Sequence, residues 1–234
     1  MNGNSIESKM MQRLNWHLAR EADVKIAWFN DDGEIDLNEA LWALPPSDLS
    51  AANHFEGLED ARHFALRRTF QRCFLKSVFN FQGPLSELPL RQERDSPPRC
   101  ELPPETSLSF SSSGTMAIAA ISATTKIGID VEYLRPVPNA LELAKRFFDQ
   151  REAAYLESLA PLDCDAEFLK LWSIKEACLK AAGKGVVYGP EKFVIDPRYR
   201  IEPPAEFGTF AHWQLEFPEF SAEHFVAMAV YMPR

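Results

Sequence analysis

Apolar residues recur with two different periods along the chain, and these periods predict both helices and strands. Over residues 59–79 the apolar side chains fall on one face of a helix. Short apolar runs at 24–29, 116–122 and 126–133 predict strands. Further helices are predicted over 140–159 and 166–182, and further strands over 212–217 and 225–231. This mixture is typical of an α+β fold.

The N-terminal segment has an apolar residue at every fourth position. Ile6, Met10, Leu14 and Leu18 predict an amphipathic helix over 5–20. We prefer a helix packed on the domain to the alternative, a membrane anchor. The segment lacks the apolar centre of a signal peptide, and no run reaches the ~20 apolar residues of a membrane span. We therefore expect no membrane contact.

A weak internal repeat appears at an offset of 104 residues. This offset aligns 68–76 with 172–180, and Ile26 and Trp28 with Asp130 and Glu132. Helices of similar period also match by chance, so the repeat stays one of two interpretations. If it is real, the chain has two similar halves, of which only the second kept the acids.

The division between these halves is predicted after a segment rich in proline and charge. Residues 82–106 have this composition and predict a linker or surface loop. The N-terminal half is then 1–106, with the extra helix and a first α+β subdomain. The C-terminal half is 107–234, with the acidic residues considered below.

Composition narrows the classes of function. The net charge of −9 argues against a nucleic-acid-binding protein, since such proteins need basic surfaces to neutralise phosphates. The four cysteines (Cys73, Cys100, Cys164 and Cys178) include no CxxC pair. We therefore expect reduced thiols in a cytoplasmic protein, without disulfides or zinc. We also expect a monomer.

Ionisable residues on two apolar elements are the candidate chemistry. Asp130 and Glu132 are two residues apart in a predicted strand, so their side chains share one face. A helical wheel places Lys175 and Glu176 on or beside the apolar face of a predicted helix. Such charges are costly to bury unless a cation or a charged ligand meets them. A buried Lys–Glu pair is the alternative explanation for the helix.

Three converging carboxylates would repel one another and raise one another's pKa. A hard divalent ion would remove this conflict, and oxygen ligands without a nearby histidine favour Mg²⁺ over zinc. Mg²⁺ in such sites usually completes its coordination with water and substrate phosphates. The predicted ligand is therefore a phosphate ester or a pyrophosphate.

The spacing of these residues resembles that of the 4′-phosphopantetheinyl transferases, in particular the long, pseudodimeric Sfp-type members. The matching segments are GIDVE at 128–132, LAKRFF at 143–148 and LWSIKE at 171–176, followed by Lys180, Gly183 and Gly185. The first half matches only loosely, through Arg62-His63-Phe64 and Arg68-Thr69.

The resemblance implies a fold of two similar α/β halves that form a pseudodimer, with the active site at their interface. It also implies an activity, the transfer of phosphopantetheine from coenzyme A to a serine of an acyl or peptidyl carrier protein. Adenosine 3′,5′-bisphosphate would be released. The partners would thus be coenzyme A and the carrier protein.

The resemblance further implies roles for single residues. Asp130, Glu132 and Glu176 would hold Mg²⁺, or Mn²⁺ in its place, against the coenzyme A pyrophosphate. Glu176 would help to deprotonate the carrier serine, and Lys180 would stabilise charge on the phosphates. Candidate contacts to coenzyme A are Arg68, Thr69, Ser111, Ser112, Lys175 and Lys180. The basic segment 145–151 would dock the acidic carrier.

Two departures from the family pattern leave alternatives open. The family commonly has a Ser-His pair where this chain has Ser111-Ser112, and Gly-Lys-Pro where it has Asp95-Ser96-Pro97. The loss of these contacts should weaken coenzyme A binding, or it should shift the contact to the 3′-phosphate to Arg62, Arg67 or Arg68. One alternative function is a catalytically weakened relative that binds a carrier protein or a nucleotide as a regulator. Another is a Mg²⁺-dependent enzyme acting on a different pyrophosphate ester.

Overall fold

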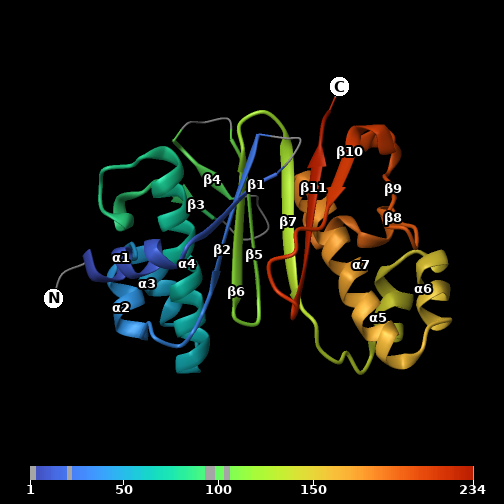
Figure 1. The fold of residues 1–234 in the computed structure, drawn as a ribbon, viewed down its shortest axis with the longest axis horizontal. Coiled ribbons are helices and arrows are strands. Elements are labelled where there is room, and N and C mark those ends of the chain that lie inside the picture. The colour runs from blue at the N-terminus through green and yellow to red at the C-terminus, as the bar shows by residue number, and fades with distance from the viewer. Residues whose placement is uncertain (1–3, 20–22, 93–97, 103–105, 234) are drawn as a thin grey trace.

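Two antiparallel sheets lie in the middle of the molecule (Figure 1). The computed structural model describes residues 4–19, 23–92, 98–102 and 106–233. The first sheet has the order β1 (Asn15–Leu18), β2 (Val24–Asn30), β6 (Met116–Ser122) and β5 (Ser107–Ser113). The second has the order β10 (Trp213–Glu216), β11 (His224–Tyr231) and β7 (Lys126–Tyr133). The strands predicted over 24–29, 116–122 and 126–133 are thus confirmed.

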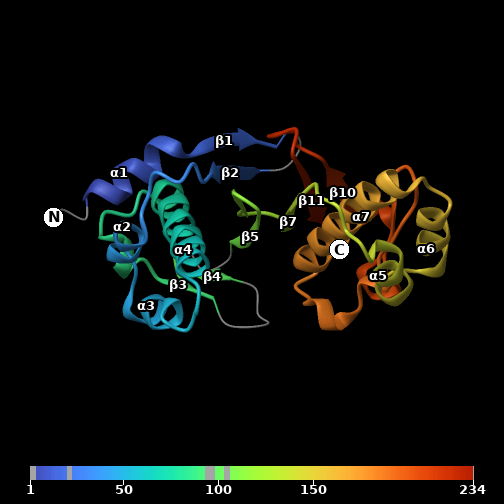
Figure 2. The same cartoon turned by 90° about the horizontal axis from the view of Figure 1, so that it is seen from below.

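Helices cover the outer side of each sheet. Beyond the first sheet lie α1 (Asn4–Arg13), α2 (Leu37–Trp42), α3 (Pro46–Ala52) and α4 (Leu58–Phe79). Beyond the second lie α5 (Ala140–Phe147), α6 (Gln150–Glu157) and α7 (Pro161–Ala181). Figure 2 shows the two groups of helices at opposite ends of the molecule, with the strands between them.

Three apolar cores hold these layers together, because each sheet buries both faces. One core lies between the first sheet and its helices, and a second lies between the second sheet and its helices. The third lies between the two sheets, where Ile26 and Ile118 of the first meet Ile129 and Met228 of the second. Burial of this kind contributes about 25 cal/mol per Å² of apolar surface.

The two sheets repeat one topology, which agrees with the predicted internal repeat. The order β2-β6-β5 corresponds to β7-β11-β10, and a long helix, α4 or α7, follows the first strand of each set. The strand alignment at an offset of 104 is wrong, however. Ile26 faces the core between the sheets, whereas Asp130 alternates with Ile129 and Val131, which face that core. A slip of one residue reverses the face, so the helix-covered positions of β2 are Ala27 and Phe29.

The N-terminal helix is shorter than predicted. Ile6, Met10 and Leu14 are buried as expected, but α1 ends at Arg13 and residues 15–18 pair with β2 as strand β1. Leu18 is accordingly 71% exposed. Pairing with the open edge of β2 outweighs the helical period in a segment whose Asn, Trp and His are modest helix formers.

The helix predicted over 140–159 is two helices. The chain leaves α5 at Phe148, and Asp149 begins α6 with a capping box that it forms with Glu152. The predicted stop at Gly183 is confirmed, since Gly183 has a φ of 67° after α7 and the Lys184 amide bonds to the Leu179 carbonyl at 2.8 Å.

The central segments fall differently from the predicted division. Strand pairing places residues 107–122, which the sequence predicts to belong to the second half, in one sheet with β2 of the first half. The region 82–106 contains a short hairpin of β3 (Leu90–Arg91) and β4 (Arg99–Cys100). Leu85, Leu88 and Cys100 are buried in the first core, so apolar anchors hold this region to the domain.

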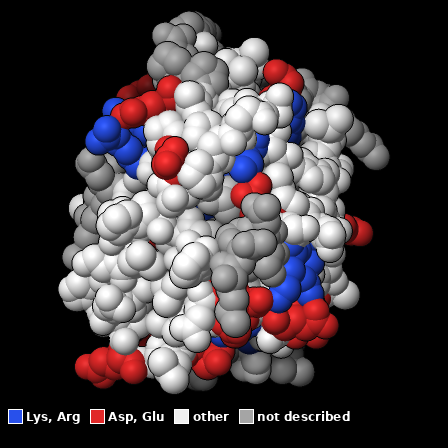
Figure 3. All heavy atoms as spheres, turned by 90° about the vertical axis from the view of Figure 1, so that its left-hand side faces the viewer, with Lys and Arg blue, Asp and Glu red and all other residues white. Residues whose placement is uncertain are grey.

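Two surface properties bear on the predicted partners. Within the described residues, no helix combines the length and hydropathy that a bilayer crossing requires. On the face formed by the first-half helices, basic side chains lie beside acidic ones (Figure 3). The described residues of that face therefore form no broad basic surface.

Candidate active site

Asp130 and Glu132 stand on the helix-facing side of β7. Ile129 and Val131, which alternate with them along the strand, are buried in the core between the sheets, so the two acids share the opposite face, as predicted. Gly128 precedes them on the same face. A Cβ at Gly128 would lie 1.9 Å from the Ala177 carbonyl oxygen of α7. Only glycine therefore allows β7 to approach α7 this closely.

Helix α7 brings Glu176 and Lys180 to these acids. The two residues are four positions apart, which places them on one side of the helix. Lys180 Nζ donates to Asp130 Oδ1 at 2.6 Å and to the Ile129 carbonyl oxygen at 3.1 Å. The structure thus brings Lys180 of the helix to Asp130 of the strand, with Glu176 one turn before Lys180 on the same side of the helix.

Strand β5 contributes hydroxyl groups from the first sheet. Ser111 Oγ donates to Asp130 Oδ1 at 2.6 Å, and Ser113 Oγ donates to Glu132 Oε2 at 3.0 Å. Ser109 Oγ accepts the Ile129 amide at 2.9 Å, and Ser113 Oγ accepts the Tyr133 amide at 3.0 Å. The two sheets are therefore joined at their edges by serine side chains.

The carboxylates influence one another through their charges. Burial raises the pKa of Glu132, and the charge of Asp130 raises it further. Burial also raises the pKa of Glu176, while Lys180 opposes this rise and Asp130 adds to it. Asp130 therefore lies close enough to affect both glutamates.

The donor set suits a hard divalent ion. Asp130 Oδ2 is buried and has no hydrogen-bond partner in the described part of the chain. A carboxylate oxygen in this condition favours a cation. Within the described ranges, no three His, Cys, Asp or Glu side chains form a group that could hold an ion as they stand. The Lys180 ammonium lies on Asp130 instead, so ion binding needs side-chain movement.

Two predicted coenzyme A contacts lie elsewhere. Lys175 is 0% exposed, and its Nζ bonds to Glu152 Oε2 at 2.7 Å and to the Phe193 carbonyl at 2.5 Å. Thr69 is also fully buried, and its hydroxyl donates to the Ala40 carbonyl at 3.1 Å. The structure does not bring either side chain to the carboxylates, because internal partners already satisfy both. For Lys175, the buried Lys–Glu pair is the arrangement observed.

A second group of predicted residues does come together beside the acids. Arg67 and Arg68 of α4 and Ser111 and Ser112 of β5 line a hollow of about 230 Å³. The Arg68 guanidinium also stacks over the Phe64 ring, 5.2 Å from its centroid. Ser111 belongs to both groups, since it lines the hollow and bonds to Asp130.

Arg62 and Arg67, the other candidate contacts to the 3′-phosphate, differ in whether their guanidinium groups are already paired. Arg62 forms a two-bond pair with Asp31 at 2.6 and 2.7 Å, so its guanidinium is occupied. Arg67 forms no ion pair or side-chain hydrogen bond within the described ranges, and burial lowers its pKa. Residues 95–97, which stand where the family has Gly-Lys-Pro, lie outside the described residues.

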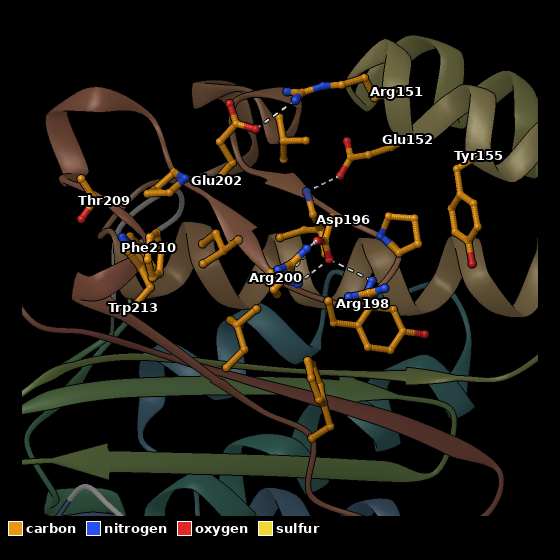
Figure 4. Close-up of a pocket in the computed structure, with 18 of the residues that line it drawn as sticks. Arg151, Glu152, Tyr155, Asp196, Arg198, Arg200, Glu202, Thr209, Phe210 and Trp213 are labelled. Atoms are coloured by element: carbon orange, nitrogen blue, oxygen red, sulfur yellow. Dashed lines mark hydrogen bonds and ion pairs between the residues drawn. The ribbon is translucent and has the colours of Figure 1, made fainter.

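A larger cavity lies away from the acids. It has a volume of about 910 Å³ and is formed by α6, the hairpin of β8 (Val194–Ile195) and β9 (Ile201–Glu202), and β10 (Figure 4). Arg151 pairs there with Glu202 at 2.9 Å, and Arg200 pairs with Asp196 at 2.7 Å. Its size alone does not make it the active site, because none of the converging groups described above faces it.

Sequence reasoning missed the contact of Ser113 with Glu132 and that of His224 with Ser113. The run SLSFSSS at 107–113 alternates serine in every second position, which is the period of one strand face and could have revealed the row of hydroxyls. His224 contacts the Ser113 carbonyl oxygen at 3.2 Å from a strand more than a hundred residues away. No local pattern predicts that contact.

Comparison with known proteins identifies the family of this chain. Residues 126–229 match the 4′-phosphopantetheinyl transferase superfamily. The chain is 33% identical to 4′-phosphopantetheinyl transferase HetI of Nostoc sp. over 187 residues, which are 79% of this chain and 77% of the relative. It is 32% identical to 4′-phosphopantetheinyl transferase Sfp of Bacillus subtilis over 171 residues, which are 69% and 71% of the two chains.

A further relative is 4′-phosphopantetheinyl transferase psf-1 of Bacillus pumilus, which is 31% identical over 144 residues. That match covers 62% of this chain and 60% of the relative. The matched family region contains β7, with Asp130 and Glu132, and α7, with Glu176 and Lys180. The chain therefore belongs to the 4′-phosphopantetheinyl transferase superfamily, of the Sfp type.

Proposed function

We propose that this chain transfers 4′-phosphopantetheine from coenzyme A to a serine of an acyl or peptidyl carrier protein. The observation that carries the proposal is the meeting of Asp130 and Glu132 from β7 with Glu176 and Lys180 from α7. Lys180 bonds to Asp130 at 2.6 Å, and the charge of Asp130 acts on both glutamates. Acidic and basic groups in this arrangement suit the transfer of a charged phosphoryl group.

We further propose that the two halves form a pseudodimer with the active site at their interface. Support comes from the repeated strand order and from the contact of β5 with β7, the neighbouring edges of the two sheets. Ser111 and Ser113 of the first sheet bond to the acids of the second. The division between the halves would then fall between β6 and β7, after residue 122.

Asp130, Glu132 and Glu176 would hold Mg²⁺, or Mn²⁺ in its place. When bound, the ion would supply positive charge to the pyrophosphate oxygens. The carrier serine oxygen would attack the phosphorus on the pantetheine side, and the bond from that phosphorus to the bridging oxygen would break. Glu176 would accept the serine proton, for which its raised pKa is favourable. Lys180 would donate to phosphate oxygens.

The hollow beside β5 is the proposed place for the nucleotide end of coenzyme A. Arg67 and Arg68 would supply positive charge, and Ser112 a hydroxyl, where the family commonly has histidine. Arg67 is the stronger candidate for phosphate, because Arg68 already contacts Gln71 at 3.3 Å and Asp48 at 3.5 Å. In this assignment, Arg67 takes over the contact to the 3′-phosphate that the family histidine would make.

We also propose that the acidic carrier protein docks near residues 145–151. Lys145 pairs with Glu157 at 2.8 Å, and Arg151 pairs with Asp149 at 2.9 Å. These pairs are exposed and contribute less than about 1 kcal/mol, so an acidic carrier can replace the internal partners.

A cytoplasmic location is supported by the four cysteines, which are all free and buried. A monomer remains our expectation.

The test is incubation of the protein with coenzyme A, Mg²⁺ and a panel of apo carrier proteins, followed by intact-mass measurement. We expect the phosphopantetheine mass to be added to one carrier serine. The Asp130→Asn variant should lose at least about 100-fold in rate. The Asp163→Asn variant changes an acid outside the site and serves as the matched control. Absence of transfer across a broad panel would overturn the proposal.

A second candidate function is a regulator that binds a carrier protein or a nucleotide without turnover. Ser112 stands in place of the family histidine, and Arg62 is occupied by Asp31, which together motivate it. Calorimetry measures carrier binding and separates the two functions. A regulator would bind a carrier protein without adding the phosphopantetheine mass to it.

A third function, an enzyme for another pyrophosphate ester, is tested by comparing the binding of coenzyme A with that of dephospho-coenzyme A. The difference measures the contribution of the 3′-phosphate, which such an enzyme would not use.

A further inference from the structure

Four serines on one face of β5 point to β7. Ser107 and Ser109 accept the amides of Ile127 and Ile129, at 3.0 and 2.9 Å, and Ser113 accepts that of Tyr133 at 3.0 Å. Ser111 and Ser113 donate to the carboxylates of Asp130 and Glu132. One strand face thus bonds to the backbone of β7 and also to its acids.

The hydroxyl contacts occupy one oxygen of each acid and leave the other. Asp130 Oδ1 accepts from both Ser111 and Lys180 at 2.6 Å, whereas its Oδ2 is buried without a hydrogen bond from the described residues. Glu132 Oε2 accepts from Ser113 at 3.0 Å. Each carboxylate therefore has one oxygen fixed by a donor of the first sheet.

Ser113 is itself held in place from two sides. Its Oγ accepts the Tyr133 amide at 3.0 Å, and its carbonyl oxygen contacts His224 Nε2 at 3.2 Å. His224 is buried, and its Nδ1 contacts Ser221 Oγ at 3.2 Å. A donor fixed in this way limits the rotation of the carboxylate that it bonds.

We propose that Ser111 and Ser113 are positioning residues that restrict Asp130 and Glu132 to binding an ion through one oxygen each. The proposal rests on the function proposed above. Mg²⁺ takes six ligands in strict octahedral geometry and is satisfied by single oxygens. Ca²⁺ takes six to eight ligands and often uses both oxygens of a carboxylate. The two hydroxyls thus make the site selective for Mg²⁺ over Ca²⁺.

The test measures ion affinities directly. Free and bound Mn²⁺ are quantified by electron paramagnetic resonance with saturating coenzyme A, and Mg²⁺ and Ca²⁺ are added as competitors. In the Ser111→Ala/Ser113→Ala double variant, the ratio of the Ca²⁺ dissociation constant to that of Mg²⁺ should fall at least about tenfold. Each single variant should give part of this change, and Ser113→Thr, which keeps the hydroxyl, should restore the ratio.

Ser107→Ala is the matched control, because it removes a serine of the same strand face that bonds to a β7 amide but to no acid. In Ser107→Ala, the ratio of the Ca²⁺ dissociation constant to that of Mg²⁺ should stay at the wild-type value. Ser111 bonds to no β7 amide, so Ser111→Ala remains informative if Ser113→Ala fails to fold.

An unchanged ratio in the folded double variant, an equal fall in Ser107→Ala, or no ion binding by the wild type would overturn the proposal. Its failure is distinguishable from failure of the proposed function. Transfer to a carrier with an unchanged ratio would reject only the selectivity role. A changed ratio with no transfer to any carrier would reject only the function.

Discussion

At the scale of single residues, the site places groups where folding alone would not favour them. Glu132 and Glu176 are partly buried carboxylates, and burial raises the pKa of both. A charged carboxylate in such a place lowers stability, because its ionised form loses hydration. Sites of this kind commonly exchange stability for function.

Glu176→Gln should raise the stability of the metal-free protein at neutral pH while abolishing transfer. Since the folded pKa lies above the unfolded one, the folded carboxyl binds its proton more tightly, and stability falls as pH rises between the two values. The variant should therefore gain on the order of 1 kcal/mol at pH 7 to 8, and the gain should vanish near pH 4.

Urea denaturation at several pH values measures this difference. Glu157→Gln, an exposed glutamate paired with Lys145, is the control and should change stability by less than about 0.5 kcal/mol. A variant less stable than the wild type at pH 8 would contradict the burial argument.

Single residues were predictable from sequence where a local period decides their direction. Strand alternation placed Asp130 and Glu132 on one face, and helical spacing brought Glu176 near Lys180. The helical wheel also placed Lys175 on the apolar face, but it did not predict which residue pairs with Lys175. Glu152 lies 23 positions earlier on α6, and only the packing of α6 on α7 brings the two together. The amphipathic pattern cannot distinguish such a pair from a ligand contact.

At the scale of elements, the approach of β7 to α7 sets the spacing of the acids. Gly128 allows it, because any larger residue would meet the backbone of α7 at Ala177 and Ala181. A flexible side chain could rotate away from the added Cβ, but the backbone atoms of α7 cannot. The helix would have to move away from the strand, carrying Glu176 and Lys180 from Asp130.

Gly128→Ala should therefore weaken both folding and ion binding. Overpacking of this kind costs about 1–3 kcal/mol, and Mn²⁺ affinity should fall about tenfold or more. Denaturation and electron paramagnetic resonance measure the two effects. Gly185→Ala is the control, since nothing lies within 4 Å of a Cβ built there. Wild-type Mn²⁺ affinity in Gly128→Ala would show that this approach does not set the spacing.

Elements were predictable when their pattern was short and apolar, as for β6 and β7, whose bounds match the predicted runs. Prediction failed where long-range pairing or a cap overrides periodicity. Residues 15–18 continue a helical period but pair with β2. Residues 140–159 keep a helical pattern, but Asp149 caps a new helix.

At the scale of the whole molecule, the core between the sheets makes the two halves one cooperative unit. Ile129 and Met228 of the second sheet pack there against strands of the first. Trp28 of β2 stacks on Phe220, which precedes β11, with ring centroids 3.9 Å apart. Ser111 and Ser113 of the first sheet bond to Asp130 and Glu132 of the second, so the geometry of the candidate site depends on both sheets.

Met228→Ala should lower the free energy of unfolding by about 2–4 kcal/mol, because Met228 is fully buried between the sheets. The transition should stay single, as calorimetry and near- and far-ultraviolet circular dichroism would report. Val187→Ala, at a side chain that is 98% exposed, should leave stability unchanged. Two separate transitions in the wild type would contradict cooperative coupling of the halves.

The repeated topology has a consequence for stoichiometry. The helix-covered face of β2 presents Ala27 and Phe29, both buried in the first core, where β7 presents Asp130 and Glu132. These two positions of the first half thus carry no carboxylates with which to build a second centre. A titration should accordingly saturate at one divalent ion and one coenzyme A per polypeptide, although the strand order occurs twice.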